Sequence, residues 1–187
     1  MTQPVAAVDR AAAARAALRR VVARHGFHGA SMGAVAEAAG VATGTVYVHY
    51  ASKDELIVAA YVEAKCALGH AAVTYPTASP ATRDRFEGLW RGAHAYLAND
   101  PDLARFLLQV DASPYAERAH LAALSAGDEL ARAASEPELL AVLVDLPPLL
   151  LYDLALGPVV RLVATGRDVD ADDLTRVVES CWRAVTR

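Results

Sequence analysis

The chain has few cysteines and few aromatic residues. Two of its 187 residues are cysteine and 6% are aromatic. Cys66 and Cys181 are too few to form a disulfide framework in a chain of this length. We therefore expect a cytoplasmic protein whose thiols stay reduced. We also expect no signal peptide, because Arg15 interrupts the early alanine run.

Long uninterrupted hydrophobic runs are missing too. The most apolar stretch, residues 139–164, is broken by charged residues and prolines. A membrane-spanning helix needs about 20 mostly apolar residues, so we expect no membrane partner.

Motifs of enzymes are also missing. The sequence has no glycine-rich phosphate loop, no nucleophile elbow and no zinc-protease helix. Cys66 and His70 lie one helical turn apart, but two ligands alone do not make a metal site, and a buried cysteine more often packs as a small hydrophobic residue. We expect no catalytic residue, metal or cofactor; a small helical enzyme is the weakest alternative.

What the chain does have is aliphatic residues. It is 55% hydrophobic with a mean hydropathy of +0.22. Alanine, leucine and valine dominate, and no alternating strand pattern stands out, so the sequence predicts an all-α fold. A chain this apolar is expected to hide further surface in an oligomer interface.

Charge is distributed unevenly along the chain, whose net charge is −4. Residues 1–60 carry six basic and four acidic side chains, whereas residues 61–187 carry 12 basic and 18 acidic ones. A basic N-terminal end on an acidic remainder fits a nucleic-acid-binding region attached to a body that avoids the duplex. Scattered surface charge is the alternative interpretation.

Residues 31–56 contain two short helices joined by a tight turn. Ser31 is suited to cap the first helix, and Gly40 is suited to end it. The second helix follows within Thr43–Tyr50, with Val46 expected to face the domain core. Helix, short glycine-containing turn and helix form the DNA-binding helix-turn-helix, whose second helix enters the major groove.

A helix is predicted on each side of this pair of helices. Residues 1–8 read as a loose arm, and Asp9 is suited to cap a helix that runs to about His25. A fourth helix, about residues 52–74, begins with the capping box Ser52-Lys53-Asp54-Glu55. A proline-containing stretch, residues 75–80, then reads as the link to a larger C-terminal region.

The N-terminal motifs resemble the DNA-binding domain of the TetR family of transcriptional repressors. The matching segments are Ala36-Glu37-Ala38-Ala39-Gly40-Val41, Gly44-Thr45-Val46-Tyr47, His49-Tyr50 and Ser52-Lys53-Asp54-Glu55-Leu56. The chain departs from the family at Ala42, where serine is frequent, so Thr43 is the alternative helix cap. It departs again at Gly33, where a long polar or basic side chain is frequent in the family.

The resemblance implies an N-terminal helix-turn-helix domain of three helices (1–55), linked by the fourth helix to a larger helical effector-binding and dimerisation domain (76–187). It implies a dimeric repressor that binds a palindromic double-stranded DNA operator and is released by a small-molecule effector. A ligand-independent or protein-regulated DNA-binding dimer is the alternative. The DNA-binding residues that the resemblance implies are Gly33, Thr43, Gly44, Thr45, Tyr47, Val48 and His49. Ser31 and Lys53 lie at helix N-termini, where we expect them to bind phosphates.

The C-terminal part predicts a dimer interface. A helix expected from Pro148 to about Thr165 is apolar nearly all round and needs cover on both sides. The last helix has a stripe of apolar residues at helical spacing. Two copies of these helices are expected to form a four-helix interface, with a central helix in a monomer as the alternative. The expected interface residues are Leu150, Leu154, Val178, Cys181, Trp182 and Val185.

Candidate effector contacts are spread over the same region. Asp153 is the most suggestive, because a carboxylate in an apolar helix needs a partner. Trp90 and Phe106 are residue types that more often pack as plain core than bind a ligand. The full set is Trp90, His94, Phe106, Gln109, Tyr115, Tyr152 and Asp153.

Overall fold

The computed structural model describes residues 9–187, and the predicted loose arm at residues 1–8 lies outside them. Twelve α-helices and one isolated antiparallel bridge, between Leu143 and Thr186, make up the regular structure of the described residues, which confirms the all-α prediction. The helices are α1 (Arg10–Gly29), α2 (Met32–Ala39), α3 (Thr43–His49), α4 (Lys53–Val73), α5 (Thr82–Ala98), α6 (Pro101–Asp111), α7 (Ala116–Ser125), α8 (Glu129–Ala134), α9 (Pro137–Leu140), α10 (Pro148–Ala155), α11 (Gly157–Ala164) and α12 (Ala171–Val185).

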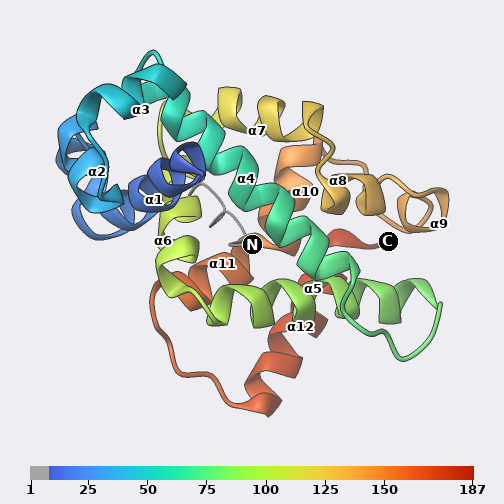
Figure 1. The fold of residues 1–187 in the computed structure, drawn as a ribbon. Coiled ribbons are helices and arrows are strands. Elements are labelled where there is room, and N and C mark those ends of the chain that lie inside the picture. Colours follow the sequence, from blue (N-terminus) through green and yellow to red (C-terminus); the bar gives the residue numbers. More distant parts are fainter. Residues whose placement is uncertain (1–8) are drawn as a thin grey trace, which may run out of the picture.

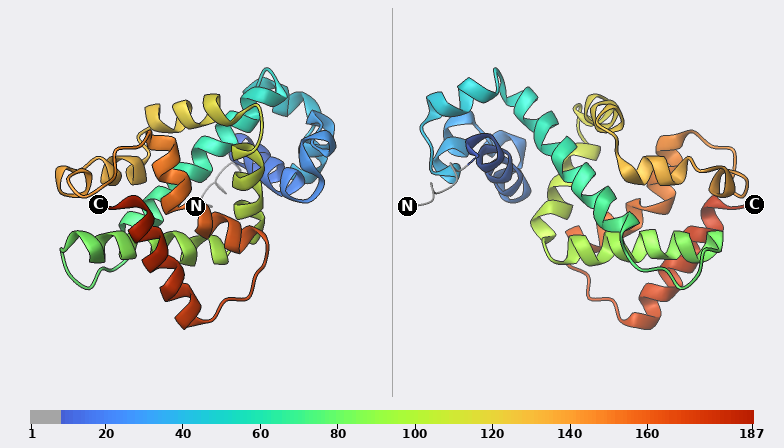
Figure 2. Two further views of the ribbon diagram at one scale, coloured as in Figure 1. Left: turned by 180° about the vertical axis from the view of Figure 1, so that it is seen from behind. Right: turned by 45° about the vertical axis from the view of Figure 1, so that its right-hand side comes forward.

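Two groups of helices lie at opposite ends of the molecule. Helices α1–α3, here called the head, gather at one end, and α5–α12, here called the body, form the other (Figures 1 and 2). Helix α4 runs from the head into the body and packs against α1, α5, α7 and α8. Helix α4 therefore links the two groups along the chain, and α1 of the head also packs directly against α6 of the body.

The head helices begin and end at local signals in the sequence. Asp9 caps α1 by accepting hydrogen bonds from the backbone N–H groups of Ala11 and Ala12. The helical path breaks near the predicted end at His25, since Gly26 has a φ of 66°. At α4, the Ser52 hydroxyl accepts from the Glu55 N–H, as a capping box requires.

Helix α4 is the one described helix that is long and apolar enough to cross a membrane by length and composition alone. Half of that apolar stretch is buried inside the protein, with Leu56, Ala60 and Leu68 among its buried residues. It also carries Glu63 and the buried Lys65. The burial of these residues is typical of a central core helix.

The helix predicted over residues 148–165 is in fact two helices, α10 and α11, which is a correction. The break falls at Leu156, whose carbonyl accepts from the N–H groups of Val159 and Val160. Pro158 has no N–H to bond back one turn, so a continuous helix would lose that hydrogen bond and meet the proline ring. The glycine before it weakens the helix further.

Within this chain, helix α10 is only partly covered. None of its residues is fully buried, and Leu149 and Leu150 are about half exposed. Helix α11, in contrast, buries Val159, Val160 and Ala164 in the body. The chain after α12 pairs with residues 142–144, because the Arg187 N–H donates to the Val142 carbonyl at 3.0 Å.

Candidate nucleic-acid interface and body cavity

The turn between α2 and α3 is built by local hydrogen bonds. The Ser31 hydroxyl accepts from the Ala34 N–H at 3.1 Å, so Ser31 caps α2. Gly40 ends α2 with a φ of 67°, and its N–H bonds back to the helix. The cap of α3 is Ala42, which offers no side-chain hydrogen bond, and Thr43 is the first helical residue. The alternative of Thr43 as the cap is therefore wrong.

The residues expected to contact DNA share an exposed surface of the head. Tyr47 is 53% exposed and Val48 is 81% exposed, whereas the preceding residue, Val46, is buried in the core. A β-carbon added at Gly44 would meet nothing within 4 Å, so this end of α3 is open. Thr45 and Lys53 are half-buried, and the exposed members of the set are Ser31, Gly33, Thr43, Gly44, Tyr47, Val48 and His49.

Lys53 has a partner inside the protein that the sequence did not indicate. Its ammonium group donates to the carbonyl of Phe27 at 2.7 Å, across the gap between α4 and α1. The interaction ties the start of α4 to the last turn of α1. A DNA phosphate at Lys53 would have to share the ammonium with this carbonyl.

Several arginines of the head are engaged in ion pairs. Arg15 and Arg19 of α1 both bind Glu63 of α4, and Arg15 also donates to the Tyr50 hydroxyl at 2.6 Å. Partial burial alone would raise the pKa of Glu63, but the hydrogen bonds from the two guanidinium groups lower it overall. Arg24 pairs with Asp102 of α6 at 2.8 Å.

Arg10 and Arg20 are therefore the exposed head arginines that lack a carboxylate partner among residues 9–187. The net charge of residues 1–60 did not indicate this division, because Glu63 and Asp102 lie further along the sequence. The positive charge available to a duplex is smaller than the count of arginines suggests.

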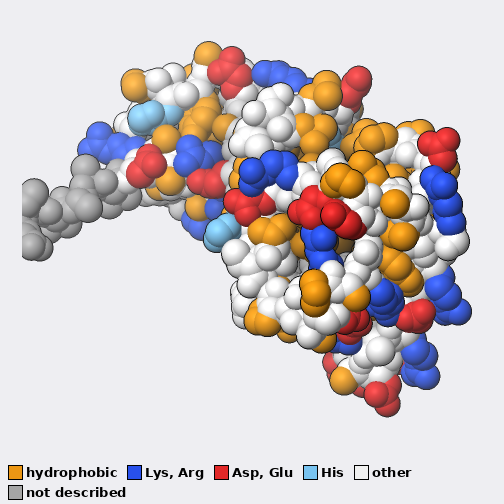
Figure 3. Space-filling model, turned by 90° about the vertical axis from the view of Figure 1, so that its right-hand side faces the viewer, with side chains coloured by type: hydrophobic (Ala, Val, Ile, Leu, Met, Phe, Trp, Pro, Cys, Tyr) orange, Lys and Arg blue, Asp and Glu red, His pale blue; other side chains and the backbone are white. Residues whose placement is uncertain are grey.

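The body contains a cavity of about 360 Å³ between α4, α5, α7–α10 and α12. The face of the protein that carries α8 and α9 shows hydrophobic side chains gathered among charged ones (Figure 3). Four lining residues carry titratable groups, Lys65, His120, Asp128 and Tyr152. The apolar lining residues are Phe86, Leu89, Ala123, Leu124, Leu130, Ala131, Ala134, Leu139, Leu140, Leu143, Pro148, Leu149, Leu151, Ala155, Leu156 and Val185.

Lys65 lies at the polar end of this cavity. It is 3% exposed, and its ammonium is 3.8 Å from Asp128 Oδ2 and 3.8 Å from the centroid of the Tyr152 ring. Burial acts to lower the pKa of Lys65, but Tyr152 and Asp128 raise it overall, so the side chain is charged at neutral pH. Burial raises the pKa of Tyr152, which keeps its hydroxyl protonated.

A second layer of polar groups lies behind Lys65. The Tyr61 hydroxyl donates to Asp111 Oδ1 at 2.8 Å, and His120 Nε2 is 3.1 Å from both of these oxygens. Burial, followed by the charge of Asp111, raises the pKa of Tyr61. The hydroxyl of Tyr152, in contrast, is buried and has no hydrogen-bond partner among the described residues.

Of the seven candidate effector residues, Tyr152 alone lines this cavity. Trp90 and Phe106 are fully buried core residues, and His94 stacks on Trp90 with the ring centroids 5.9 Å apart. Gln109 donates to the carbonyl of Val22 at 2.9 Å. These four residues therefore pack the core or bind the head.

Tyr115 and Asp153 also lie away from the cavity. The Tyr115 hydroxyl donates to Asp54 at 2.9 Å. Asp153 is exposed on α10, so its carboxylate is solvated and needs no buried partner. Sequence reasoning missed Lys65, His120 and Asp128; a lysine next to the apolar stripe of α4 was the one local signal.

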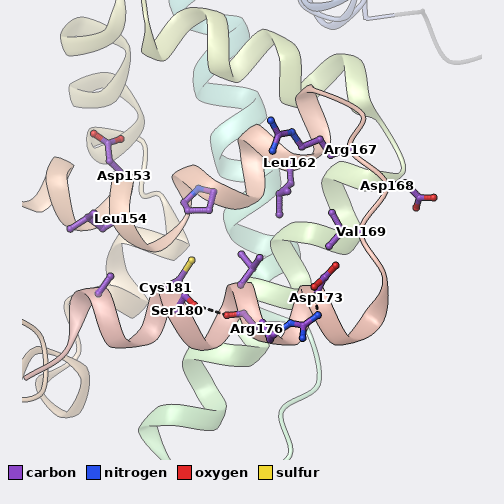
Figure 4. A pocket seen from close by; sticks show the side chains of 13 residues that line it. Asp153, Leu154, Leu162, Arg167, Asp168, Val169, Asp173, Arg176, Ser180 and Cys181 are labelled. Carbon is purple, nitrogen blue, oxygen red and sulfur yellow. Dashed lines mark hydrogen bonds and ion pairs between the residues drawn. The ribbon is translucent and has the colours of Figure 1, made fainter.

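A second, more open groove of about 650 Å³ lies between α10 and α11 on one side and α12 on the other (Figure 4). Asp153, Leu154 and Leu162 line one side, and Arg176, Ser180 and Cys181 line the other. This is the surface from which the dimer residues were expected to project.

The candidate dimer residues divide into two groups. Leu150 and Leu154 are 49% and 41% exposed and remain available to a partner. Val178, Cys181 and Val185 are buried in the core of this chain, because the apolar stripe of α12 faces α5 and α10. Trp182 is half-buried, with its ring centroid 5.1 Å from that of Phe86.

Within residues 9–187, no group of three or more histidine, cysteine, aspartate and glutamate side chains is placed to hold a metal ion. Cys66 and Cys181 are free thiols. The Cys66–His70 pair carries no third ligand, and His70 faces Glu129 at 3.4 Å.

Comparison with known proteins agrees with this architecture. The protein-family model described as bacterial regulatory proteins, tetR family, matches residues 14–60. The family model of the tetracyclin repressor-like C-terminal domain matches residues 81–186. A search of curated proteins found no match.

Solved structures share the fold. A TetR family transcription regulator from Marinobacter aquaeolei VT8 is 22% identical, with 95% of each chain covered and a TM-score of 0.74. The TetR-family transcriptional regulator HI0893 from Haemophilus influenzae is 22% identical, with 96% of this chain and 97% of that chain covered and a TM-score of 0.72.

Proposed function

Since the chain belongs to the TetR family of DNA-binding transcriptional regulators, we propose that it is a cytoplasmic, homodimeric repressor released from a palindromic operator by a small molecule. The family is not enzymatic. The observation that carries the proposal is the exposed α2–α3 surface, where Val48 and Tyr47 project from a helix that is anchored in the head core by Val46. We assign residues 1–55 to DNA binding and residues 76–187 to dimerisation and effector binding, with α4 between them.

The side chains on this surface suggest how DNA is held. We assign Thr45, Tyr47 and His49 to the phosphate backbone, and Ser31 with the start of α2 and Lys53 to further phosphates. Thr43, Gly44, Val48 and Gly33 face base edges in this arrangement. The set lacks arginine, asparagine and glutamine, so sequence preference relies on methyl contacts, bridging waters and duplex shape.

Selection from random DNA followed by footprinting tests this assignment on the full chain. We expect a palindrome whose half-sites are about 34–36 Å apart or a multiple of one helical turn. Val48→Asp, which places a carboxylate on the exposed face of α3, should abolish binding, whereas Leu121→Asp on exposed α7 should not. A single asymmetric half-site would contradict a symmetric dimer.

We assign the dimer surface to α10 and to the open groove beside α12. Leu149, Leu150 and Leu154 expose apolar area that nothing in the described chain covers. A two-fold symmetric contact would cover the same residues on both copies. Leu150→Glu with Leu154→Glu should give a monomer in analytical ultracentrifugation; a dimer that persists would place the interface elsewhere.

Helix α7 provides a physical connection between the cavity and the head. His120 and Leu124 line the cavity, while Tyr115, the residue before α7, binds Asp54 and packs on Phe27 with ring centroids 5.3 Å apart. Phe27 in turn accepts the hydrogen bond from Lys53. A ligand that shifts α7 would therefore disturb contacts at a proposed phosphate-binding lysine, provided that it prefers the non-binding conformation.

A further inference from the structure

We propose that the body cavity binds a small amphipathic molecule with a hydrocarbon body and an oxygen hydrogen-bond acceptor at one end. The acceptor, a carboxylate or a neutral carbonyl, is held by the ammonium of Lys65 and the hydroxyl of Tyr152. This inference rests on the proposed function and names the chemical class of its effector.

The shape and lining of the cavity set the body of the ligand. Its volume of about 360 Å³ lies near the small end of the range of about 300–1,000 Å³ found for ligand sites. Leucines from α7–α10 form much of the wall, and the titratable lining side chains belong to Lys65, His120, Asp128 and Tyr152. Such a wall favours a flexible hydrocarbon over a polar metabolite.

Two donors at the polar end lack an acceptor. The Tyr152 hydroxyl is buried and unpaired within the described residues. The Lys65 ammonium is 3.8 Å from Asp128 Oδ2, which is an ion-pair distance but too long for a hydrogen bond. Buried polar groups are nearly always hydrogen-bonded, so two donors lining one cavity indicate that an acceptor belongs between them.

The carboxylates near this site are already engaged, which argues against a cationic ligand. Asp128 Oδ1 accepts from the Leu130 N–H at 3.0 Å, and Oδ2 faces Lys65. Asp111 accepts from the Tyr61 hydroxyl and lies 3.1 Å from His120 Nε2. A cationic head would meet the Lys65 charge and would leave the Tyr152 donor without an acceptor.

A matched series of ten-carbon probes tests the ligand class by isothermal titration calorimetry on the full chain. Decanoate and methyl decanoate present an acceptor, with and without charge, while protonated decylamine presents only donors. We expect both acceptors to bind and decylamine to fail. Binding by decylamine as tight as that of the acceptors, or binding by none of the three, would overturn the inference.

Two variants test the assigned donors. Tyr152→Phe removes only the hydroxyl and should weaken binding of both acceptor probes about tenfold. Lys65→Met should weaken decanoate more than methyl decanoate, because only the former loses an ionic contact. Tyr75→Phe removes an exposed hydroxyl outside the cavity and serves as the control. Unchanged affinity in Tyr152→Phe, with the fold confirmed by circular dichroism, would refute the proposed contact.

Operator binding is measured separately by fluorescence anisotropy on ligand-free protein. If DNA binding holds and the probes fail, the ligand class is wrong and the regulator assignment stands. If the probes bind and no duplex does, the proposed function fails while the cavity assignment stands.

Discussion

The head and the body of this molecule place their functional side chains in opposite ways. In the head, the residues proposed to meet DNA are exposed on a short helix, with Val48 81% exposed. In the body, the charged pair at the cavity is buried, with Lys65 3% and Asp128 5% exposed. An exposed surface depends on local helix signals, whereas a buried site depends on which helices meet. The two regions therefore differ in how much change they tolerate.

Two glycines, Gly92 in the body and Gly44 in the head, test this difference, and Gly92 should give the larger effect. A β-carbon on Gly92 of α5 would lie 2.9 Å from Ala72 Cα and 3.0 Å from the Ala71 carbonyl oxygen, so the backbones of α4 and α5 would have to separate. We expect Gly92→Ala to lower the free energy of unfolding by about 1–3 kcal/mol. Urea denaturation followed by circular dichroism measures the loss.

A stability equal to that of the parent chain would show that the α4–α5 crossing is looser than the structure indicates. Gly157→Ala is the matched control, because a β-carbon there meets nothing within 4 Å.

Lys53 lies where the two regions communicate, and its loss should be felt at every DNA sequence. Lys53→Ala would remove the phosphate contact proposed for this lysine, so the slope of log affinity against log salt should flatten by about one unit. It also removes the hydrogen bond to Phe27 and should lower stability by about 0.5–1.5 kcal/mol.

Binding titrations at several sodium chloride concentrations separate the two roles of Lys53. An unchanged slope together with lower stability would make Lys53 a structural link between α4 and α1. Arg161→Ala, on body helix α11, is the comparison variant because it removes an exposed arginine outside the head that has no carboxylate partner among the described residues.

Gly44, in the head, is the glycine to compare with Gly92 in the body. Since its position in α3 is open, Gly44→Ala should stabilise the fold by about 0.5–1 kcal/mol through helix propensity. The same methyl group would stand between α3 and the duplex, so operator affinity should fall. Higher melting temperature with unchanged affinity would place Gly44 away from the DNA.

The sequence predicted the head well because its signals are local. Ser31, Gly40 and the Ser52–Glu55 box act within one helical turn, and the structure shows each at the expected cap. The alternative of Thr43 as the cap of α3 was wrong, since Thr43 is the first helical residue and α3 begins without any side-chain cap.

The body was predicted less well because its site depends on distant pairings. Spacing placed Val178, Cys181 and Val185 on one face of α12 but could not tell which neighbour that face meets. Lys65 and Asp128 come together only when α4 meets the start of α8. Pro158 already indicated a helix break near Leu156 in the sequence. The prediction of one continuous helix gave more weight to the apolar composition of the segment.

The smallest expected effect concerns the ionic contact between α1 and α4. The pKa of Glu63 is lowered in the folded protein, so its pairing with Arg15 and Arg19 contributes stability above the unfolded pKa, near 4.5. That contribution disappears as the pH falls through the lower folded pKa. Because Glu63 is partly exposed, we expect Glu63→Gln to cost below about 1 kcal/mol at pH 7.

The difference between the parent chain and Glu63→Gln should shrink as urea denaturation is repeated from pH 7 towards pH 3. Glu37→Gln, which removes an exposed carboxylate with no ion pair among the described residues, sets the baseline. A difference that stays constant over this range would mean that Glu63 supports the α1–α4 contact by packing, because lost packing does not titrate whereas a lost charge pair does.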